Sequence, residues 1–238
     1  MLNSRPKPVI GYIMMGGSAA METELHRNLP EGLEMATTRV PFSKVTYDGL
    51  LAMTDRLPEA ARILAEARPN VIGVTNFIAS CFRGREMVNR IQQATGIPAV
   101  VPALEYVSIL HDMGAKRITV FSCFDPKLRL LEELFFNENK IEVDHVFELE
   151  TPDQPDPFAF SRLDDLRAAE MVGRAELPST DAVLVDLPTF RMTGEVCAAL
   201  SRHRDIPILS LTQVLLWSTF EKVGASREGL YLSRFLTP

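Results

Sequence analysis

The stretch that decides the fold class is Val9-Ile10-Gly11-Tyr12-Ile13-Met14-Met15-Gly16-Gly17-Ser18. Its apolar run, Val9–Met15, is typical of a strand buried on both faces of a parallel sheet. The two glycines that follow predict a loop. Strand-like and helix-like segments alternate from here to the end of the chain, which predicts an α/β fold.

Later elements follow the same pattern. The spacing of apolar residues predicts strands over Val71–Ile78 and Ala182–Leu187, and a helix over Arg85–Ala94. Tyr47–Ala67 is helical in pattern, but Pro58 inside it predicts either a kink or two successive helices. Each predicted strand is short enough to belong to one layer of a sheet.

The second half of the chain resembles the first. Ile97-Pro98-Ala99-Val100 begins a strand and helix that end at Met113-Gly114-Ala115. Ile206-Pro207-Ile208-Leu209 begins another that ends at Val223-Gly224-Ala225, so the offset is 109 residues at the start (97 to 206) and 110 at the end (114 to 224). The repeat predicts two pseudo-symmetric lobes, each a parallel four-stranded sheet flanked by helices, with an active-site cleft between them. We expect residues 1–115 plus 210–238 to form the first lobe and residues 116–209 the second.

Composition limits the partners. The chain has 238 residues and a formal net charge of −6, which disfavours nucleic acid and anionic membranes. No apolar stretch reaches the ~20 residues of a membrane span, and residues 1–8 do not read as a signal peptide. Three widely spaced cysteines form no metal knuckle, the histidines show no ligand spacing, and no nucleotide-binding glycine motif is present. We therefore expect a cytoplasmic protein without a metal or a cofactor.

The ends of the strands are where a ligand is expected. In open α/β sheets ligands bind beyond the carboxyl ends of the strands, and two facing lobes bring those ends to one cleft. The segments to consider are Met15–Ser18, Thr75–Ile78, Pro102–Glu105, Ser122–Asp125, Asp186–Arg191 and Ser210–Gln213. The Pro- and acid-rich loop Glu148–Ser161 is either a simple connector or a lid over the cleft.

Several of these segments resemble a known group of enzymes. Gly11-Tyr12-Ile13, Met21-Glu22-Thr23-Glu24 and Thr38-Arg39-Val40-Pro41 look like the opening of maleate cis–trans isomerases. Ser80-Cys81-Phe82-Arg83-Gly84 is similar to the same place in arylmalonate decarboxylases. The resemblance is to the aspartate/glutamate racemase superfamily. It implies two pseudo-symmetric α/β lobes, no cofactor, and chemistry at a carbon next to a carboxylate.

The resemblance does not extend to the catalytic cysteines. Isomerases and racemases of this group carry one cysteine after the third strand of each lobe, and the decarboxylases keep the second. Alignment of the motifs places Asn76 and Leu187 at these positions, so a two-cysteine mechanism is not expected here. Phe124 stands at a family tyrosine, and Phe77-Ile78 stand where the family has a hydroxyl-rich carboxylate cradle. Arg191 matches an arginine of the maleate isomerase pattern.

Two acids and one amide are the candidate catalytic residues. Glu105, if it lines the cleft, is a general acid or base whose pKa burial would raise; otherwise it is an acid at a helix N-terminus. Asp186 precedes the replaced cysteine and is either catalytic or caps the next turn, and strand alternation allows it to face away from the substrate. Asn76 cannot titrate and would orient a carboxylate.

The other candidates are substrate-binding residues. Gly16, Gly17 and Ser18 form either an anion-binding nest or a tight turn. Cys123 is either a nucleophile or a buried, inert thiol. The full set of predicted binding residues is Gly16, Gly17, Ser18, Phe77, Ile78, Cys123, Phe124, Leu187, Pro188, Thr189 and Arg191.

Two functions remain open. The first is a cofactor-independent isomerase, decarboxylase or lyase that acts next to a carboxylate of a small, partly apolar organic acid. The alternative is a catalytically degenerate relative that binds a small carboxylate or serves as a non-catalytic partner. We also expect a homo-oligomer, and the apolar surface around Trp217 is either core or a dimer face.

Overall fold

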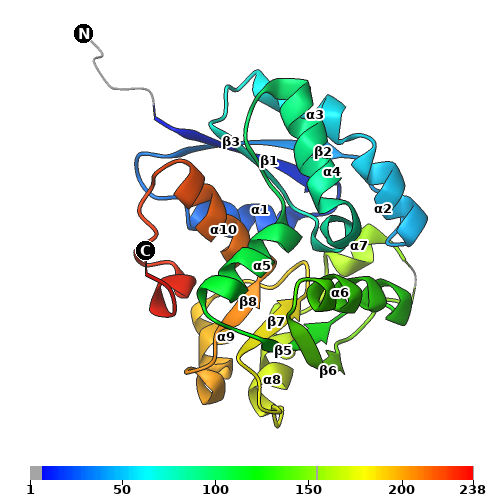
Figure 1. Cartoon of the computed structure of the whole chain (residues 1–238), viewed down its shortest axis with the longest axis vertical. Helices are drawn as coiled ribbons and strands as arrows, with labels where there is room; N and C mark the ends of the chain where they lie inside the picture. Colours follow the sequence, from blue (N-terminus) through cyan, green and yellow to red (C-terminus); the bar gives the residue numbers. More distant parts are fainter. Residues whose placement is uncertain (1–6, 154, 238) are drawn as a thin grey trace.

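The computed structural model describes residues 7–153 and 155–237 and contains two parallel four-stranded sheets (Figure 1). Their strand orders are β2-β1-β3-β4 and β6-β5-β7-β8, so the second sheet repeats the topology of the first. The strands are β1 (Val9–Met15), β2 (Glu34–Val40), β3 (Val71–Val74), β4 (Ala99–Val100), β5 (Arg117–Ser122), β6 (Glu142–Glu148), β7 (Ala182–Asp186) and β8 (Ile208–Ser210). The predicted fold class is confirmed.

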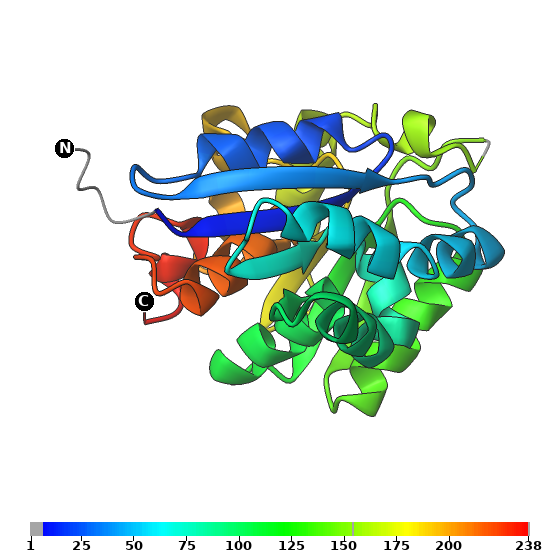
Figure 2. The same cartoon turned by 90° about the horizontal axis from the view of Figure 1, so that it is seen from above.

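Helices connect the strands and cover the sheets. In the top view, α1 lies on the opposite side of the first sheet from α3, which packs on β1 and β2 (Figure 2). The α-helices are α1 (Ala19–Arg27), α2 (Tyr47–Thr54), α3 (Leu57–Ala65), α4 (Phe77–Thr95), α5 (Pro102–Asp112), α6 (Pro126–Glu138), α7 (Pro157–Phe160), α8 (Asp165–Arg174), α9 (Gly194–Ala199) and α10 (Leu211–Lys222). The region around Pro58 thus forms two helices, one of the two predicted alternatives.

The repeat seen in the sequence recurs in the backbone. Gly114 and Gly224 end α5 and α10 with left-handed φ angles of 69° and 66°. The next residue closes each helix in the same way, because Ala115 N donates to Leu110 O and Ala225 N to Phe220 O, both at 2.9 Å. A left-handed residue after a helix favours glycine, which explains why glycine stands at both positions.

Helix α10 returns the chain to the first sheet. It leaves β8 and packs against β3 and α5, and the Tyr12 hydroxyl lies 2.8 Å from Thr219 Oγ1. Trp217 is buried here with the Arg227 guanidinium 4.2 Å from its ring centroid, so it belongs to the core. This packing supports the predicted lobe boundaries, residues 1–115 plus 210–238 and residues 116–209, which stay a prediction.

The end of β3 differs from the expectation. The strand ends at Val74 rather than Ile78, and α4 begins at Phe77 rather than Arg85. Asn76 caps the helix because its side chain accepts a hydrogen bond from Ala79 N. Phe77-Ile78-Ala79 is buried, and an apolar run of this length does not distinguish a strand from a buried first helical turn.

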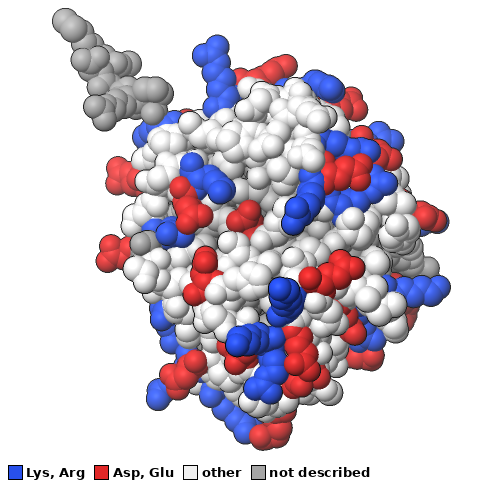
Figure 3. All heavy atoms as spheres, in the orientation of Figure 1, with Lys and Arg blue, Asp and Glu red and all other residues white. Residues whose placement is uncertain are grey.

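The surface of the molecule carries both basic and acidic side chains (Figure 3). On the face shown in Figure 3, basic and acidic side chains are interspersed rather than gathered by sign. None of the helices described is both long and apolar enough to span a membrane. Residues 1–6, where the sequence predicts no signal peptide, and residue 154 of the loop Glu148–Ser161 lie outside the described residues.

Candidate functional site

A cavity of about 60 Å³ lies where the carboxyl ends of strands from both sheets meet. Asn76 reaches it after β3, Phe124 after β5 and Asp186 at the end of β7. Its lining includes nine of the predicted site residues, namely Gly17, Ser18, Asn76, Phe77, Ile78, Phe124, Asp186, Pro188 and Thr189. We call this cavity the interlobe pocket.

The rest of the lining is mostly apolar. Residues that sequence reasoning did not assign to the site come from the stretch that runs from α1 through α2 and from the segment around α7. They are Ala20 and Met21 of α1, Phe42 and Val45 between β2 and α2, Leu50 of α2, and Pro157, Phe160 and Ser161. Among the lining residues described by the structure, Asp186 is the one charged side chain, and Cys, His, Lys and Arg are absent.

Helix α4 points its N-terminus at the interlobe pocket. Asn76 Oδ1 accepts from Ala79 N at 2.8 Å, which leaves the side-chain NH₂ group to donate to a bound molecule. The first N–H groups of a helix have no intrahelical partner, and the helix dipole favours an anion there. Ser80 locks this turn to α5, because its Oγ donates to Phe77 O at 2.6 Å and accepts from Ala103 N at 2.9 Å. The first lobe therefore presents neutral, preorganised donors.

The second lobe presents an acid. Asp186 is only 5% exposed and ends β7, where Cys123 N donates to its carbonyl oxygen. Burial raises the pKa of its carboxyl to about 6, although a hydrogen bond from Glu132 opposes the rise. A carboxyl with a pKa near neutrality can both hold and release a proton at physiological pH.

Glu132 is a buried acid that sequence reasoning missed. It lies on α6 and is only 2% exposed. Burial, and then the neighbouring Asp186 carboxyl, raise its pKa well above the usual range. The signal was available, because Glu132 stands between Leu128 and Phe136 at helical spacing, on the buried stripe of α6. An acid on such a stripe is rarely buried without a partner.

Leu187 does not reach the interlobe pocket. Its side chain lines a separate depression with Leu149, Leu163 and Met171. The side chains of successive residues in an extended chain face opposite sides. Asp186 faces the interlobe pocket and Leu187 faces away from it, which is the reverse of the predicted orientation. Leu187, predicted as a substrate-binding residue, is therefore not part of the described lining of the interlobe pocket, whereas Asn76 is.

Glu105 lies outside the interlobe pocket. It is half-buried in the first turn of α5 and faces α10. Burial raises the pKa of its carboxyl, while a hydrogen bond with Ser218 and the charge of Lys222 lower it. The condition for a catalytic role, a place among Phe77, Ile78 and Phe124, is not met in this structure.

Gly16 and Cys123 are also absent from the described lining of the interlobe pocket. Ser18 N donates to Met15 O at 3.1 Å, and neither Gly16 nor Gly17 has a left-handed φ, so the loop is a tight turn rather than an anion nest. Cys123 is fully buried, and burial together with the Asp186 and Glu132 carboxyls raises the pKa of its thiol. A thiol in such surroundings is a poor nucleophile.

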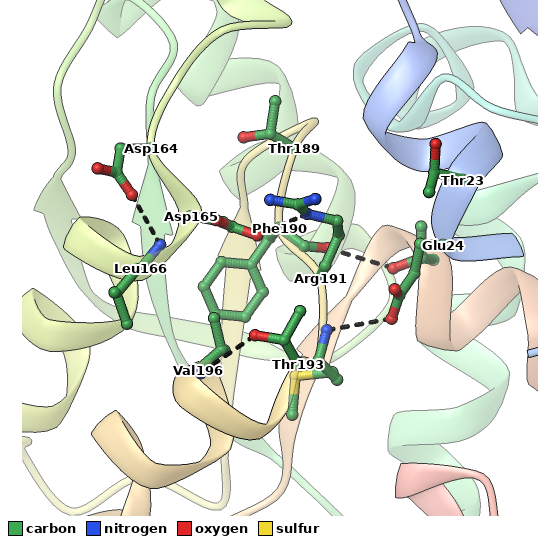
Figure 4. A network of polar contacts seen from close by, with 12 residues as sticks. Thr23, Glu24, Asp164, Asp165, Leu166, Thr189, Phe190, Arg191, Thr193 and Val196 are labelled. Carbon is green, nitrogen blue, oxygen red and sulfur yellow. Dashed lines mark hydrogen bonds and ion pairs between the residues drawn. The ribbon is translucent and has the colours of Figure 1, made fainter. Parts of the chain in front are cut away.

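Arg191 is engaged elsewhere. Its Nε donates to Asp165 Oδ2 at 2.7 Å, and Glu24 on α1 accepts from Met192 N at 3.2 Å (Figure 4). Thr189, which does line the interlobe pocket, donates its hydroxyl to Leu163 O at 2.8 Å. The structure therefore places Arg191 in a network that joins α1 to the loop after β7, outside the lining of the interlobe pocket.

The segment before α8 covers one side of the interlobe pocket. Phe160 of α7 stacks on Phe124 with ring centroids 5.2 Å apart, and Val45 N donates to Pro155 O at 2.8 Å. A Cβ at Gly17 would lie 3.2 Å from Pro157 O, so glycine permits this close approach. The contacts with Val45 and Gly17 join this segment to the first lobe across the pocket, which favours the lid over the simple connector.

Comparison with known proteins gives the family. The arylmalonate decarboxylase (Amdase) family model matches residues 10–236. A maleate isomerase from Pseudomonas putida is 28% identical over 192 residues, which cover 74% of this chain and 76% of that protein.

Solved structures share the fold at lower identity. The maleate isomerase Iso from another Pseudomonas putida strain has a TM-score of 0.81 at 19% identity, covering 92% of this chain and 93% of that one. A Nocardia farcinica maleate cis–trans isomerase with a covalently bound succinylcysteine intermediate has a TM-score of 0.80 at 18% identity, with 92% and 93% covered. An arylmalonate decarboxylase has a TM-score of 0.73 at 17% identity, with 94% and 97% covered.

The interlobe pocket lies between two α/β lobes, each built on a parallel sheet. The Asp186 carboxyl is in one wall of the pocket and the N-terminus of α4 is in the other. The protein is thus of the two-lobed α/β class with its site between the lobes. The chain belongs to the arylmalonate decarboxylase family. The predicted resemblance to maleate isomerases and arylmalonate decarboxylases is confirmed.

Proposed function

We propose that this chain is a cofactor-independent decarboxylase of a small, partly apolar organic acid that bears two carboxyl groups on one carbon. The observation that carries the proposal is the Asp186 carboxyl, 5% exposed and with its pKa raised to about 6, in the wall of the interlobe pocket. Related proteins are named for decarboxylation of arylmalonates and isomerization of maleate. No cysteine is assigned a role, because the described lining of the interlobe pocket contains none and the sequence predicts Asn76 and Leu187 at the family's cysteine positions.

One acid suits decarboxylation better than racemisation. A two-base racemase needs acid and base groups on opposite faces of the substrate carbon. Asp186 is the one such group in the described lining of the interlobe pocket. In a decarboxylation the bond between the α-carbon and one carboxylate breaks, CO₂ leaves, and the electron pair stays on the α-carbon. The proton of the Asp186 carboxylic acid is then transferred to one face of that carbon.

The carboxylate that stays on the substrate must be bound by neutral donors, because the described lining of the pocket contains no cation. The N-terminus of α4 and the Asn76 amide supply donors for it, and these also stabilise the enediolate that forms as CO₂ departs. The apolar side chains of Phe77, Ile78 and Phe160 exclude water and fit an apolar substituent. A substrate less polar than maleate is therefore expected.

The test is incubation of the protein with alkyl- and arylmalonates in D₂O, followed by NMR. We expect CO₂ release and one deuterium at the α-carbon, with a single configuration. Asp186→Asn should abolish both, whereas Asp144→Asn, on the exposed part of β6, should change neither. Turnover by Asp186→Asn at the rate of the unmodified chain would contradict the proposal.

A second candidate is a non-catalytic carboxylate-binding protein. The absence of a cysteine from the described lining of the interlobe pocket favours it, because the related isomerase structure holds its intermediate on a cysteine. In this case malonates would raise the melting temperature without being consumed, since a ligand specific for the folded state stabilises it. Release of CO₂ from any bound malonate excludes this candidate.

A further inference from the structure

A second buried acid, Glu132, lies behind Asp186, outside the lining of the interlobe pocket. Glu132 of α6 and Asp186 of β7 are 2% and 5% exposed, and their carboxyl groups lie within hydrogen-bonding reach of each other. Glu132 Oε1 and Asp186 Oδ2 are buried and accept from no donor group among the described residues. Asp186 lines the interlobe pocket, whereas Glu132 is not part of its lining.

This contact requires a proton. Two ionised carboxylates are both acceptors and cannot hydrogen-bond to each other, so one of them is protonated. Two neighbouring ionised carboxylates in a buried site also repel each other, which favours the same single protonation. Burial and the adjacent Asp186 raise the pKa of Glu132 well above its ordinary value, and its hydrogen bond holds the pKa of Asp186 lower than burial alone would. Because Glu132 is the more buried of the two and does not line the pocket, the proton is assigned to Glu132 when one of the two is ionised.

The surroundings offer little positive charge. The groups that face the pair are Cys81 of α4, Tyr106 of α5, Cys123 after β5, and Arg129 and Glu133 of α6. Arg129 is the cation among them, and its Nη2 donates to Glu148 at 2.6 Å. Phe136, one turn beyond Glu132, packs on Phe77 with ring centroids 6.0 Å apart, which holds α6 against α4.

We propose that Glu132 is a positioning residue whose protonated carboxyl donates to Asp186 and orients it toward the substrate carbon. The inference rests on the proposed role of Asp186. After CO₂ leaves, Asp186 gives its proton to the α-carbon and becomes a carboxylate that accepts from Glu132. Asp186 regains a proton from solvent after the product leaves, and Glu132 keeps its own throughout. One proton is consumed and one CO₂ is released in each turnover.

The first test needs no substrate. Infrared spectroscopy of the whole chain, labelled with ¹³C-carboxyl glutamate, should show a protonated glutamic acid band that persists at pH 8. The band should vanish in Glu132→Gln and remain in Glu138→Gln, a matched change on the exposed end of α6. Absence of the band in the unmodified chain would overturn the proposal even if every Glu132 variant failed to fold.

The second test separates positioning from folding. If protonated Asp186 is the acid, the decarboxylation rate falls as the pH rises through the pKa of Asp186. Glu132→Leu removes the donor, so this fall should move up by about 1 to 2 pH units, the effect of one hydrogen bond to a charged group. Glu132→Gln keeps a hydrogen-bond donor, so it should move the pH of this fall by less than about half of the shift seen in Glu132→Leu. Equal profiles for the Leu variant and the unmodified chain would overturn the positioning role.

The two proposals fail separately. A persistent glutamic acid band in a chain that decarboxylates no malonate supports the shared proton and contradicts the proposed function. Turnover without the band supports the function and contradicts the role of Glu132.

Discussion

Strands β3 and β7 hold the same place in two sheets of identical strand order, yet their carboxyl ends carry different chemistry. After β3 the chain passes through Asn76 into α4, a helix of 19 residues. After β7 it passes through Asp186 and a turn in which Phe190 N donates to Leu187 O, and α9 begins only at Gly194. Topological symmetry thus does not extend to the site, because one lobe supplies neutral donors and the other an acid.

Under the proposed function, this asymmetry would let an acidic protein bind an acidic substrate with no cation among the described lining residues of the pocket. A helix N-terminus attracts the carboxylate, while an ionised Asp186 would repel it. Burial raises the pKa of Asp186 to about 6, so protonation is readily accessible. A bound anion nearby favours the protonated form further, and protonation turns the acid from a repulsive group into a donor.

The largest expected effect comes from removing the acid. Asp186→Asn keeps the shape of the side chain but cannot donate a proton to carbon. We expect kcat for malonate decarboxylation to fall by about 10² to 10⁴, the usual range for a general acid. Steady-state kinetics with a CO₂ assay would measure it, with Asp144→Asn as the control. A loss below about threefold would contradict the division of roles between the lobes.

A carboxylate after β3 as well as at the end of β7 should strongly weaken binding of the malonate substrate. Asn76→Asp keeps an oxygen that caps α4, so the free energy of unfolding should change by less than about 0.5 kcal/mol. The added charge repels the substrate carboxylate, and we expect KM to rise at least about tenfold. Asn76→Ala is the comparison, because it loses the cap and about 1 kcal/mol of stability. An unchanged KM in Asn76→Asp would place the carboxylate elsewhere.

The buried pair should also appear in the pH dependence of stability. A carboxyl with a raised pKa in the folded state stabilises the fold fully below its unfolded pKa, near 4, and that contribution is lost as the pH rises through the folded pKa. Because the pKa values of both Glu132 and Asp186 are raised, the unfolding free energy should fall between pH 4 and pH 8. Glu132→Gln should reduce this fall by about 1.4 kcal/mol for each pKa unit removed.

Urea unfolding at several pH values measures this difference. Glu138→Gln is the control, since its side chain is exposed on the same helix. Parallel pH curves for Glu132→Gln and the unmodified chain would show that Glu132 titrates as it does in the unfolded chain.

The smallest effect is expected at Arg191, which sequence reasoning assigned to the substrate. Its partner in the structure is Asp165, and its own side chain is 31% exposed. Arg191→Ala should therefore cost at most about 1 kcal/mol of stability and change KM by less than about twofold. A large rise in KM with unchanged stability would return Arg191 to the binding site.

Sequence reasoning predicted the fold because its signals are local and repeated. Apolar runs bounded by glycine predicted the strands, and Gly114 and Gly224 marked equivalent helix ends in the two halves. The strand ends that line the interlobe pocket followed from the rule for parallel sheets. The same rule predicts Asn76 and Asp186 as site residues, and both line the interlobe pocket.

The errors arose where orientation and long-range packing decide. The sequence does not fix the phase of alternation after β7: the pattern predicts Leu187 in the pocket, but the structure has Asp186 there and Leu187 in a separate depression. Glu132 was missed because its partner lies 54 positions away (132 to 186), on an element that only the fold brings near. The start of α4 was misplaced because a buried helix turn and a buried strand have the same composition.

The most direct test of the account is a cysteine-free chain. Cys81, Cys123 and Cys197 are the three cysteines of the sequence, and all can be changed to Ala in one variant. If Asp186 is the acid, that variant should decarboxylate malonates in D₂O within about threefold of the unmodified rate and place one deuterium on one face of the α-carbon. Loss of turnover in a variant that keeps its fold would show that sulfur carries the proton and that the central claim is wrong.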